Sequence, residues 1–330
     1  MWFEKLTGFR EESPEQVRAN IEINGNKLIS KINQKEYTFG KLEIPTLEEL
    51  RRQLNIEKYN SKIQVSEIVG DVQTLHEEIE NNGAFFQVAS QFNLLEMIGP
   101  HVTPEHGIDR YEHDFTQGPA CAIACGAGTI YRNYFVPVND KTGQTINNQI
   151  DCLEFIGKEL RNDEFLLWKM RNGYCLPDRE GLININNQLN NMDISEREYL
   201  KGKLKIGLQS DTQVTLNTSD NKVTQAYCSA LPVAYSNFES ELWENFARLI
   251  LEATYETAFF GALKNFERTG KNKVFLTLVG GGAFGNKTKW IFDAIKSSFK
   301  KFSKTPLDIK IISYGSSNPE VVRFLAGSFY

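Results

Sequence analysis

The chain has 330 residues, of which 41% are hydrophobic and 24% charged, so it can bury the core of an ordinary globular protein of one or two domains. Its 42 acidic and 37 basic residues leave a formal net charge of −5 without a long basic block, which makes nucleic acid an unfavoured partner. No run approaches the roughly 20 apolar residues that span a bilayer, and the N-terminus lacks the features of a secretory signal. Five irregularly spaced cysteines form no disulfide framework. These features predict a cytoplasmic protein without a membrane segment.

Residues 1–60 are predicted to form an N-terminal elaboration of helix, hairpin and helix. The sequences SPEQ at 13–16 and TLEE at 46–49 each have a capping residue and a returning Gln or Glu, which is typical of a helix start. Between them, the Asn-Gly pair at 24–25 indicates a hairpin turn. The rest of the chain, 61–330, is expected to form one ligand-binding domain.

Alternating strands and helices begin near residue 61. A strand starts at 63–65, and Asp71 can cap a helix with Val72, Leu75 and Ile79 on one face. The Asn-Gly pair at 82–83 ends this helix, and the apolar run at 84–89 indicates a buried strand. The segment therefore predicts a β-α-β unit.

The middle of the chain is less regular. Residues 131–138 are strand-like, residues 149–161 are helical, and the Asn-Gly pair at 172–173 indicates a hairpin tip. Residues 178–220 are rich in Asn and favour no single element.

The last third repeats the alternation of strand and helix. A strand is expected from residue 223, and residues 239–268 have the helical spacing of the longest helix. The apolar strand at 273–279, a helix at 288–299 and a strand at 307–314 complete a second β-α-β unit. The chain is thus expected to have an α/β fold.

The sharpest local signal is the sequence GGGAFG at 280–285, which lies between an expected strand and an expected helix. Glycines permit positive φ and close approach to a ligand, and the N–H groups at a helix start attract phosphate. We interpret the segment as a diphosphate cradle; the alternative is a turn needed only for tight packing of strand against helix. Four glycines in six residues would destabilise the fold without a functional reason, which favours the cradle.

The same six residues also match the G-x-G-x-x-G pattern of NAD-binding proteins. That pattern normally opens a domain and is followed by further β-α units, whereas the sequence ends 45 residues after Gly285. The acidic residue at a suitable distance, Asp308, lies near the start of its strand and could not reach a ribose beyond the strand's carboxyl end. An NAD-dependent enzyme is therefore the weakest of the hypotheses.

The loop that follows the strand at 84–89 is dense in ionisable residues and holds three of the four histidines. Loops at the carboxyl ends of strands are where α/β folds place ligand contacts. Carboxylates there suit hydrolysis at an anomeric carbon, where one group activates water and another assists the leaving group. The alternatives are a solvated charged loop and a zinc site, but the spacing matches no zinc motif and we expect no metal. Cys121 and Cys125 are expected to be small residues on a buried helix face.

These residues resemble the macrodomain superfamily. The GGGAFG segment is similar to the phosphate loop of poly(ADP-ribose) glycohydrolases, and QVASQFNLLE at 87–96 is similar to the Asn-bearing loop of macrodomains. The overall likeness is to the MavL group of bacterial effector macrodomains, and it covers about residues 60–330. The resemblance implies a three-layer α/β/α fold with a mixed sheet, and removal of ADP-ribose from modified protein without a cofactor.

The resemblance also implies a set of site residues. Asn93 would bind the distal ribose, and Gln117 and Gly118 would form the other wall of the phosphate site. The expected ligand-binding residues are Gln91, Phe92, Asn93, Gln117, Gly118, Gly280, Gly281, Gly282, Ala283, Phe284 and Gly285. The catalytic acid does not transfer from the family, because the sequence after Asn93 lacks both the usual glycines and a pair of adjacent glutamates. The catalytic candidates, in order, are Asp114, Asp109 and Glu96.

Two hypotheses from different classes therefore remain. The first is a hydrolase that binds ADP-ribose or an ADP-ribosylated protein and removes mono-ADP-ribose from a side chain. The second is a non-catalytic reader of ADP-ribose or a related nucleotide, which needs the glycine segment but not the acids.

Overall fold

A computed structural model describes residues 1–328, and its centre is one mixed sheet of seven strands. Their order is β4 (Lys41–Glu43), β11 (Gly207–Gln213), β12 (Lys222–Cys228), β6 (Phe85–Ala89), β13 (Lys273–Leu276), β14 (Asp308–Ser313) and β5 (Gln64–Val69). The strands from β12 to β5 are parallel, and β11 runs antiparallel to both of its neighbours. The carboxyl ends of five strands therefore meet at one edge of the sheet.

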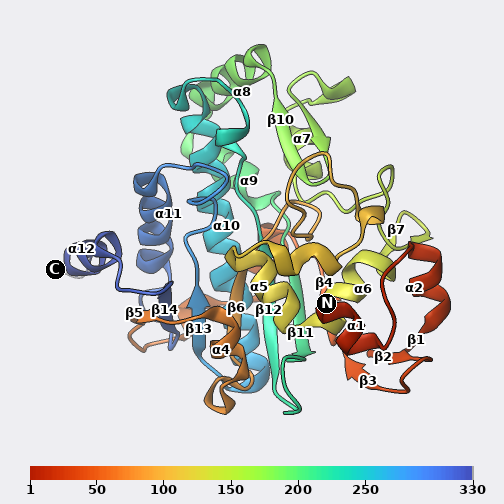
Figure 1. Ribbon diagram of the computed structural model, residues 1–330. Helices are drawn as coiled ribbons and strands as arrows, with labels where there is room; N and C mark the ends of the chain where they lie inside the picture. Colours follow the sequence, from red (N-terminus) through yellow and green to blue (C-terminus); the bar gives the residue numbers. More distant parts are fainter. Residues whose placement is uncertain (329–330) are drawn as a thin grey trace.

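Helices cover both faces of this sheet (Figure 1). Side chains along β6 alternate between the two faces. Phe85 contacts Gly261 on one face, and Phe86 stacks on His76 on the other, with ring centroids 3.7 Å apart. The first face is covered by α10 (Ser240–Thr269), which packs against α3 (Leu47–Gln53), α8 (Arg179–Asn191), α9 (Ile194–Gly202) and α11 (Thr288–Lys301). The second face is covered by α4 (Val72–Glu77), α5 (Gln117–Ala124) and α6 (Gly126–Tyr134). The predicted α/β fold with a mixed sheet between helical layers is confirmed.

The N-terminal elements form a small layer beside α6, at the right of Figure 1. They are α1 (Trp2–Thr7), α2 (Pro14–Asn20) and a three-stranded sheet of β1 (Ile21–Asn24), β2 (Lys27–Ser30) and β3 (Glu36–Thr38). A second hydrophobic cluster joins this layer to α5 and α6, and Phe39 stacks on Tyr131 at 4.0 Å between ring centroids. Because β4 belongs to the main sheet and α3 packs on α10, the second part of residues 1–60 is continuous with the larger unit.

The remaining elements lie at the periphery of the sheet. They are the hairpin β9 (Trp168–Arg171) and β10 (Tyr174–Pro177), the short pair β7 (Pro137–Val138) and β8 (Lys141–Thr142), α7 (Glu154–Glu159) and α12 (Pro319–Ser328). Six short 3-10 helices are described: η1 (Ile56–Lys58), η2 (Ile79–Asn81), η3 (Pro104–His106), η4 (Asp109–His113), η5 (Asp163–Phe165) and η6 (Val233–Tyr235). Of these, the hairpin and η6 contribute residues to the lining of the candidate site.

Most predicted elements are confirmed, including both hairpin tips and the longest helix. The strand-like segment 131–138 was a wrong prediction, because residues up to Tyr134 belong to the buried helix α6. The helix expected at 149–161 is only α7, and the helix after Asp71 ends at Glu77, which leaves Ile79 70% exposed. The Asn-rich segment 178–220 contains α8 and α9, each capped by an aspartate.

All five cysteines are buried and unpaired, which agrees with their interpretation as small interior residues. Burial raises the pKa of the Cys125 thiol to about 12. Among residues 1–328, no helix has both the length and the apolar character needed to cross a membrane.

Candidate functional site

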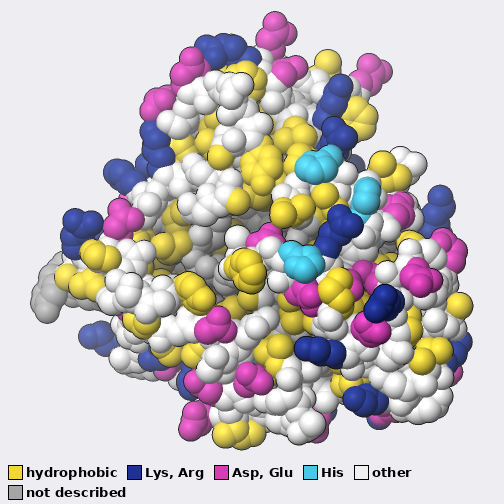
Figure 2. Space-filling view, viewed as in Figure 1, with side chains coloured by type: hydrophobic (Ala, Val, Ile, Leu, Met, Phe, Trp, Pro, Cys, Tyr) yellow, Lys and Arg dark blue, Asp and Glu magenta, His cyan; other side chains and the backbone are white. Residues whose placement is uncertain are grey.

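A cavity of about 320 Å3 lies where β6, β12 and β13 end, next to the start of α5. Figure 2 shows it as a hollow near the centre of the face. This is the position at which parallel α/β sheets place their ligands, and the volume is within the usual range for small-molecule sites. Its lining residues are Ala89, Ser90, Gln91, Glu96, Met97, Ile98, Asp114, Thr116, Gln117, Gly118, Pro119, Tyr174, Ala230, Tyr235, Thr277, Leu278, Val279, Gly280, Gly282, Ala283 and Phe284.

The glycine segment forms a tight loop between β13 and α11. Gly280 and Gly285 have φ of +80° and +70°, and a Cβ atom on either would collide with Ala230 or Ala234. Asn286 closes the loop, because its side-chain amide donates to the carbonyl oxygen of Leu231 at 2.8 Å and its backbone N–H donates to that of Gly280 at 2.9 Å. The two outer glycines are therefore explained by the turn itself.

Gly282 has no such structural explanation. It lines the cavity, its φ lies outside the positive range, and a Cβ atom there would have no neighbour within 4 Å. Within residues 1–328, the backbone N–H groups of Gly282, Ala283 and Phe284 have no hydrogen-bond acceptor. A run of unpaired N–H groups around an unhindered glycine is what close approach by an anion requires.

The N-terminus of α5 forms another part of the cavity wall. A Cβ atom on Gly118 would collide with the carbonyl oxygen of Ala89, so only glycine lets this helix start against the end of β6. Gln117 ties the two elements together: its amide oxygen accepts from the N–H of Ala89 at 2.9 Å, and its amide nitrogen donates to the carbonyl oxygen of Gln87 at 2.9 Å. No side chain caps this helix start, so its positive end is available to an anion in the cavity.

Three aromatic rings make the apolar wall of the cavity. The ring centroid of Tyr174 lies 5.1 Å from that of Tyr235 and 5.3 Å from that of Phe284. The Tyr174 hydroxyl donates to the carbonyl oxygen of Met97 at 2.7 Å, which fixes the hairpin β9–β10 against the loop after β6. These rings can pack on the face of a sugar or a base.

Glu96 is the buried carboxylate of the site. It lines the cavity with only 2% of its surface exposed, and its Oε2 atom has no hydrogen-bond partner. Its Oε1 atom lies 3.4 Å from a guanidinium nitrogen of Arg132, which is itself buried between Leu94, Gln209 and the Tyr227 ring. Burial raises the pKa of Glu96 to about 7, although Arg132 opposes this shift. A carboxyl group with this pKa can exchange protons at neutral pH.

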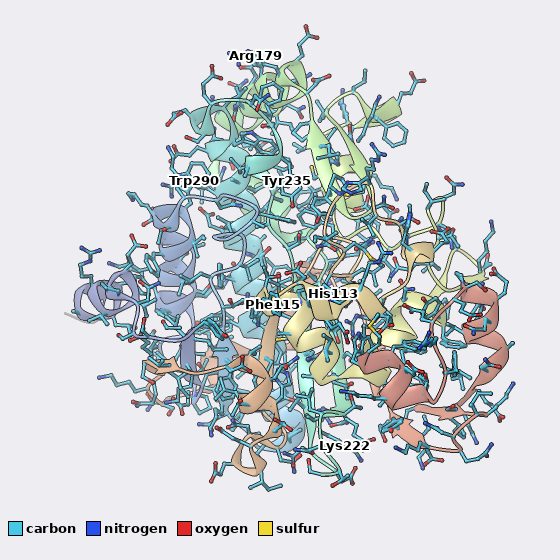
Figure 3. The ribbon with its side chains drawn as sticks, in the orientation of Figure 1. His113, Phe115, Arg179, Lys222, Tyr235 and Trp290 are labelled. Carbon is cyan, nitrogen blue, oxygen red and sulfur yellow. The ribbon has the colours of Figure 1, made fainter. Side chains whose placement is uncertain are left out.

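Asp114 is the second carboxylate of the cavity, and it is only half-buried. Its Oδ1 atom accepts from the N–H of Thr116 at 2.9 Å, just before α5 begins. The next residue, Phe115, is 95% exposed. Figure 3 shows Phe115 beside His113 and on the opposite side of the hollow from Tyr235.

Several predicted site residues lie outside the cavity lining. Asn93 is buried, and its amide donates to Gln149 at 2.9 Å, so it organises the loop instead of facing a ligand. The Asp109 carboxylate is turned toward the backbone of Phe3 in the N-terminal layer. The other predicted ligand-binding residues that are absent from the lining are Phe92, Gly281 and Gly285. The expected ribose contact by Asn93 and the catalytic role of Asp109 therefore receive no support from the geometry.

A second hollow of about 360 Å3 adjoins the first and shares Thr277 and Leu278 with it. It lies at the end of β14 and includes Tyr314, whose side chain is 81% exposed. Two adjoining hollows suit an elongated ligand with two bulky ends. Across residues 1–328, no three His, Cys, Asp or Glu side chains are grouped so that they could hold a metal ion.

No protein-family model and no curated protein sequence matches this chain. Solved structures of poly(ADP-ribose) glycohydrolases are similar in fold. The enzyme from Thermomonospora curvata has a TM-score of 0.43 and 10% identity, over 94% of each chain. The enzyme from Deinococcus radiodurans in complex with ADP-ribose has a TM-score of 0.42 and 10% identity, over 86% of this chain and 92% of the other. Likeness at this level leaves the function to be argued from the residues of the site, and the MavL resemblance stays a prediction.

The sequence did not reveal the aromatic wall or the role of Arg132. Tyr174 and Tyr235 come from the hairpin and from η6, which only the fold brings together with Phe284. Arg132 lies in the segment that was predicted as a strand, so its burial behind Glu96 was not foreseen. The weak signals were the Asn-Gly pair that precedes Tyr174 and the sequence CSALPVAY that contains Tyr235.

Proposed function

We propose that the cavity binds ADP-ribose, with its diphosphate between the glycine loop and the N-terminus of α5. The observation that carries this proposal is the run of unpaired N–H groups at Gly282, Ala283 and Phe284, which lines the same cavity as the uncapped helix start at Gln117 and Gly118. Neutral N–H groups and a helix dipole can bind two phosphates in a chain whose net charge is negative.

The two ends of the ligand would occupy the two hollows. The adenosine would extend into the second hollow, where Tyr314 offers an exposed ring. The distal ribose would lie in the first hollow against Tyr174 and Phe284, within the part of the cavity that Glu96 and Asp114 line.

We further propose that the chain hydrolyses the bond to the anomeric carbon of that ribose. Glu96, the deeper carboxylate, would act as the general base for a water molecule held inside the cavity. Asp114, near the mouth, would stabilise the oxocarbenium-like transition state and orient the departing group. Water would then attack from the inner side while the leaving group departs toward solvent.

The preferred substrate is a protein side chain that carries one ADP-ribosyl group. The sequence after Asn93 has a single glutamate where glycohydrolases of the polymer have a pair, which disfavours the polymer. Phe115 lies between the lining residues Asp114 and Thr116 and is 95% exposed, so its ring would be available to contact a protein that carries the ADP-ribosyl group.

Calorimetric titration with ADP-ribose, with ADP and NAD as controls, tests the binding proposal. Gly282→Val should weaken ADP-ribose binding at least about 10-fold, because the side chain would block the approach to the free N–H groups. Gly327→Val is the matched control, since Gly327 also has open space around it and lies in α12, outside both hollows. Absence of ADP-ribose binding by the unmodified protein would overturn the proposal.

Release of ADP-ribose from mono-ADP-ribosylated protein tests the catalytic proposal. Loss of turnover in Glu96→Gln and Asp114→Asn, with ADP-ribose binding retained, would support hydrolysis. Binding of the modified protein without any release would instead establish the reader hypothesis.

A further inference from the structure

Glu11 connects the N-terminal layer to the loop that carries the candidate catalytic acids. Its Oε2 atom accepts from the backbone N–H groups of Ile108 and Asp109, at 2.8 and 2.7 Å. Its Oε1 atom accepts from the Tyr134 hydroxyl at 2.5 Å. One side chain thus provides acceptors for two N–H groups at the start of η4 and for a residue at the end of α6.

The segment before η4 leaves space for the Glu11 carboxylate. Gly107 has φ of +83°, and a Cβ atom there would collide with Oε2 of Glu11, so glycine is required on both grounds. The first helix adds two contacts nearby: the Trp2 indole N–H donates to the carbonyl oxygen of Ile108 at 3.3 Å, and the Trp2 backbone N–H donates to Glu112 at 2.9 Å. The N-terminal layer therefore holds η4 at both ends.

From η4, this support extends to the backbone of both acidic residues of the cavity. The Tyr111 hydroxyl accepts from the backbone N–H of Glu96 at 3.0 Å, and the Tyr111 carbonyl oxygen accepts from the N–H of Asp114 at 3.1 Å. Tyr111 is thus bonded to both acids, and it lies two residues after the N–H group that Glu11 binds. Among residues 1–328, by contrast, no hydrogen bond joins the glycine loop at 280–285 to this network.

We propose that Glu11 is a positioning residue for hydrolysis: it fixes η4 and thereby places Asp114 and Glu96 against the distal ribose. This inference rests on the proposed hydrolytic function. It assigns the N-terminal layer to catalysis, while binding of the diphosphate stays with the glycine loop and α5.

The test compares Glu11→Ala, Glu11→Gln and the control Glu12→Ala. Glu12 is its exposed neighbour, and its carboxylate makes no described hydrogen bond or ion pair. For Glu11→Ala we expect amide hydrogen exchange at 107–114 to rise and kcat to fall at least about 10-fold, while the Kd for ADP-ribose stays within about twofold. Glu11→Gln keeps one oxygen acceptor and should recover part of the lost kcat. Glu12→Ala should match the unmodified protein.

The outcomes distinguish a failure of the positioning role of Glu11 from a failure of the proposed hydrolysis. Unchanged exchange at 107–114 in Glu11→Ala, or raised exchange with unchanged kcat, would overturn the positioning role while hydrolysis stands. A parallel loss of ADP-ribose binding would also overturn it, because that result indicates general unfolding. If the unmodified protein releases no ADP-ribose, the hydrolytic function itself fails and the inference fails with it.

Discussion

Glu96 combines deep burial, an unpartnered oxygen atom and a nearby cation, and under the proposed mechanism its protonation state would control turnover. Because its pKa is raised to about 7, the general-base role predicts that kcat rises with pH and levels off above about 7. Glu96→Gln should lower kcat at least about 100-fold and abolish this ascending limb. A pH–rate profile for both proteins provides the measurement, and an unchanged profile in the variant would remove Glu96 from the mechanism.

The two aspartates of the acidic loop are expected to behave differently. Asp114 lines the cavity, whereas the Asp109 carboxylate is turned toward Phe3. Asp114→Asn should therefore reduce turnover at least about 100-fold with ADP-ribose binding retained, and Asp109→Asn should leave turnover within about threefold. The reverse order of effects would show that the loop adopts another arrangement when the substrate is bound.

Among the elements, the glycine loop of the proposed phosphate site could be predicted from the sequence because its signal is local. Glycines between a strand and a helix indicate their own backbone conformation. Gln117 and Gly118 were expected only from the family resemblance, and their contacts with the end of β6 come from the fold. The carboxylate assignment could not be predicted in this way. The sequence favoured Asp114 and Asp109 over Glu96, and the structural difference between the two aspartates arises only when α1 packs on η4.

The error at α6 has a physical reason. The segment is rich in aromatic residues, which favour strands on a half-buried surface, but α6 is buried on nearly all sides and packs between the sheet and the N-terminal layer. Its polar residues Thr129, Arg132 and Asn133 share one face at helical spacing, but that face is buried instead of lying in solvent. Tertiary packing decides the structure of such a segment.

The hairpin β9–β10 allows a test at the scale of one element. Asn172 and Gly173 have φ of 48° and 78°, and a Cβ atom on Gly173 would lie 2.5 Å from the side-chain oxygen of Asn93. Gly173→Ala should displace the hairpin, and Tyr174 with it, so we expect a stability loss of about 1–3 kcal/mol and weaker ADP-ribose binding. Thermal unfolding and titration measure the two effects, and wild-type values for both would contradict the hairpin's role in the cavity.

At the scale of the whole molecule, Glu256 joins four helices on one side of the sheet. Arg51 of α3, Lys201 of α9 and Lys301 of α11 all pair with this carboxylate of α10. Burial raises the pKa of Glu256, but its bonds to Arg51 and Lys301 outweigh burial and leave the pKa below its usual value. Glu256→Gln should lower the free energy of unfolding by about 1–3 kcal/mol, because Lys301 loses its carboxylate partner and Arg51 and Lys201 keep only their pairs with Glu198 and Glu252. Denaturant unfolding tests this, with Glu252→Gln as the control whose ion pairs are at 3.7 and 3.9 Å.

The pKa of Glu96 is shifted in the opposite direction to that of Glu256, and the pH dependence of the free energy of unfolding should show this. A carboxyl group whose folded pKa is raised from 4.5 to about 7 binds its proton more tightly in the folded state. The contribution of Glu96 to the free energy of unfolding therefore declines as the pH rises from about 4.5 to about 7. Urea unfolding of Glu96→Gln across this range should show a flatter dependence than the unmodified protein, and equal slopes would contradict a raised pKa.

Alkylation of the five buried cysteines can report local unfolding of the segments that contain them. Each thiol is buried, and burial raises the pKa of Cys125, Cys152 and Cys228, so a maleimide should react with them only after the surrounding segment has separated from the core. Cys121 and Cys125 belong to the α5 region, whereas Cys175 lies in strand β10 of the hairpin. The order in which these thiols are labelled would therefore rank the local stability of the two cavity walls. Ligand that bridges these walls should delay the alkylation of both.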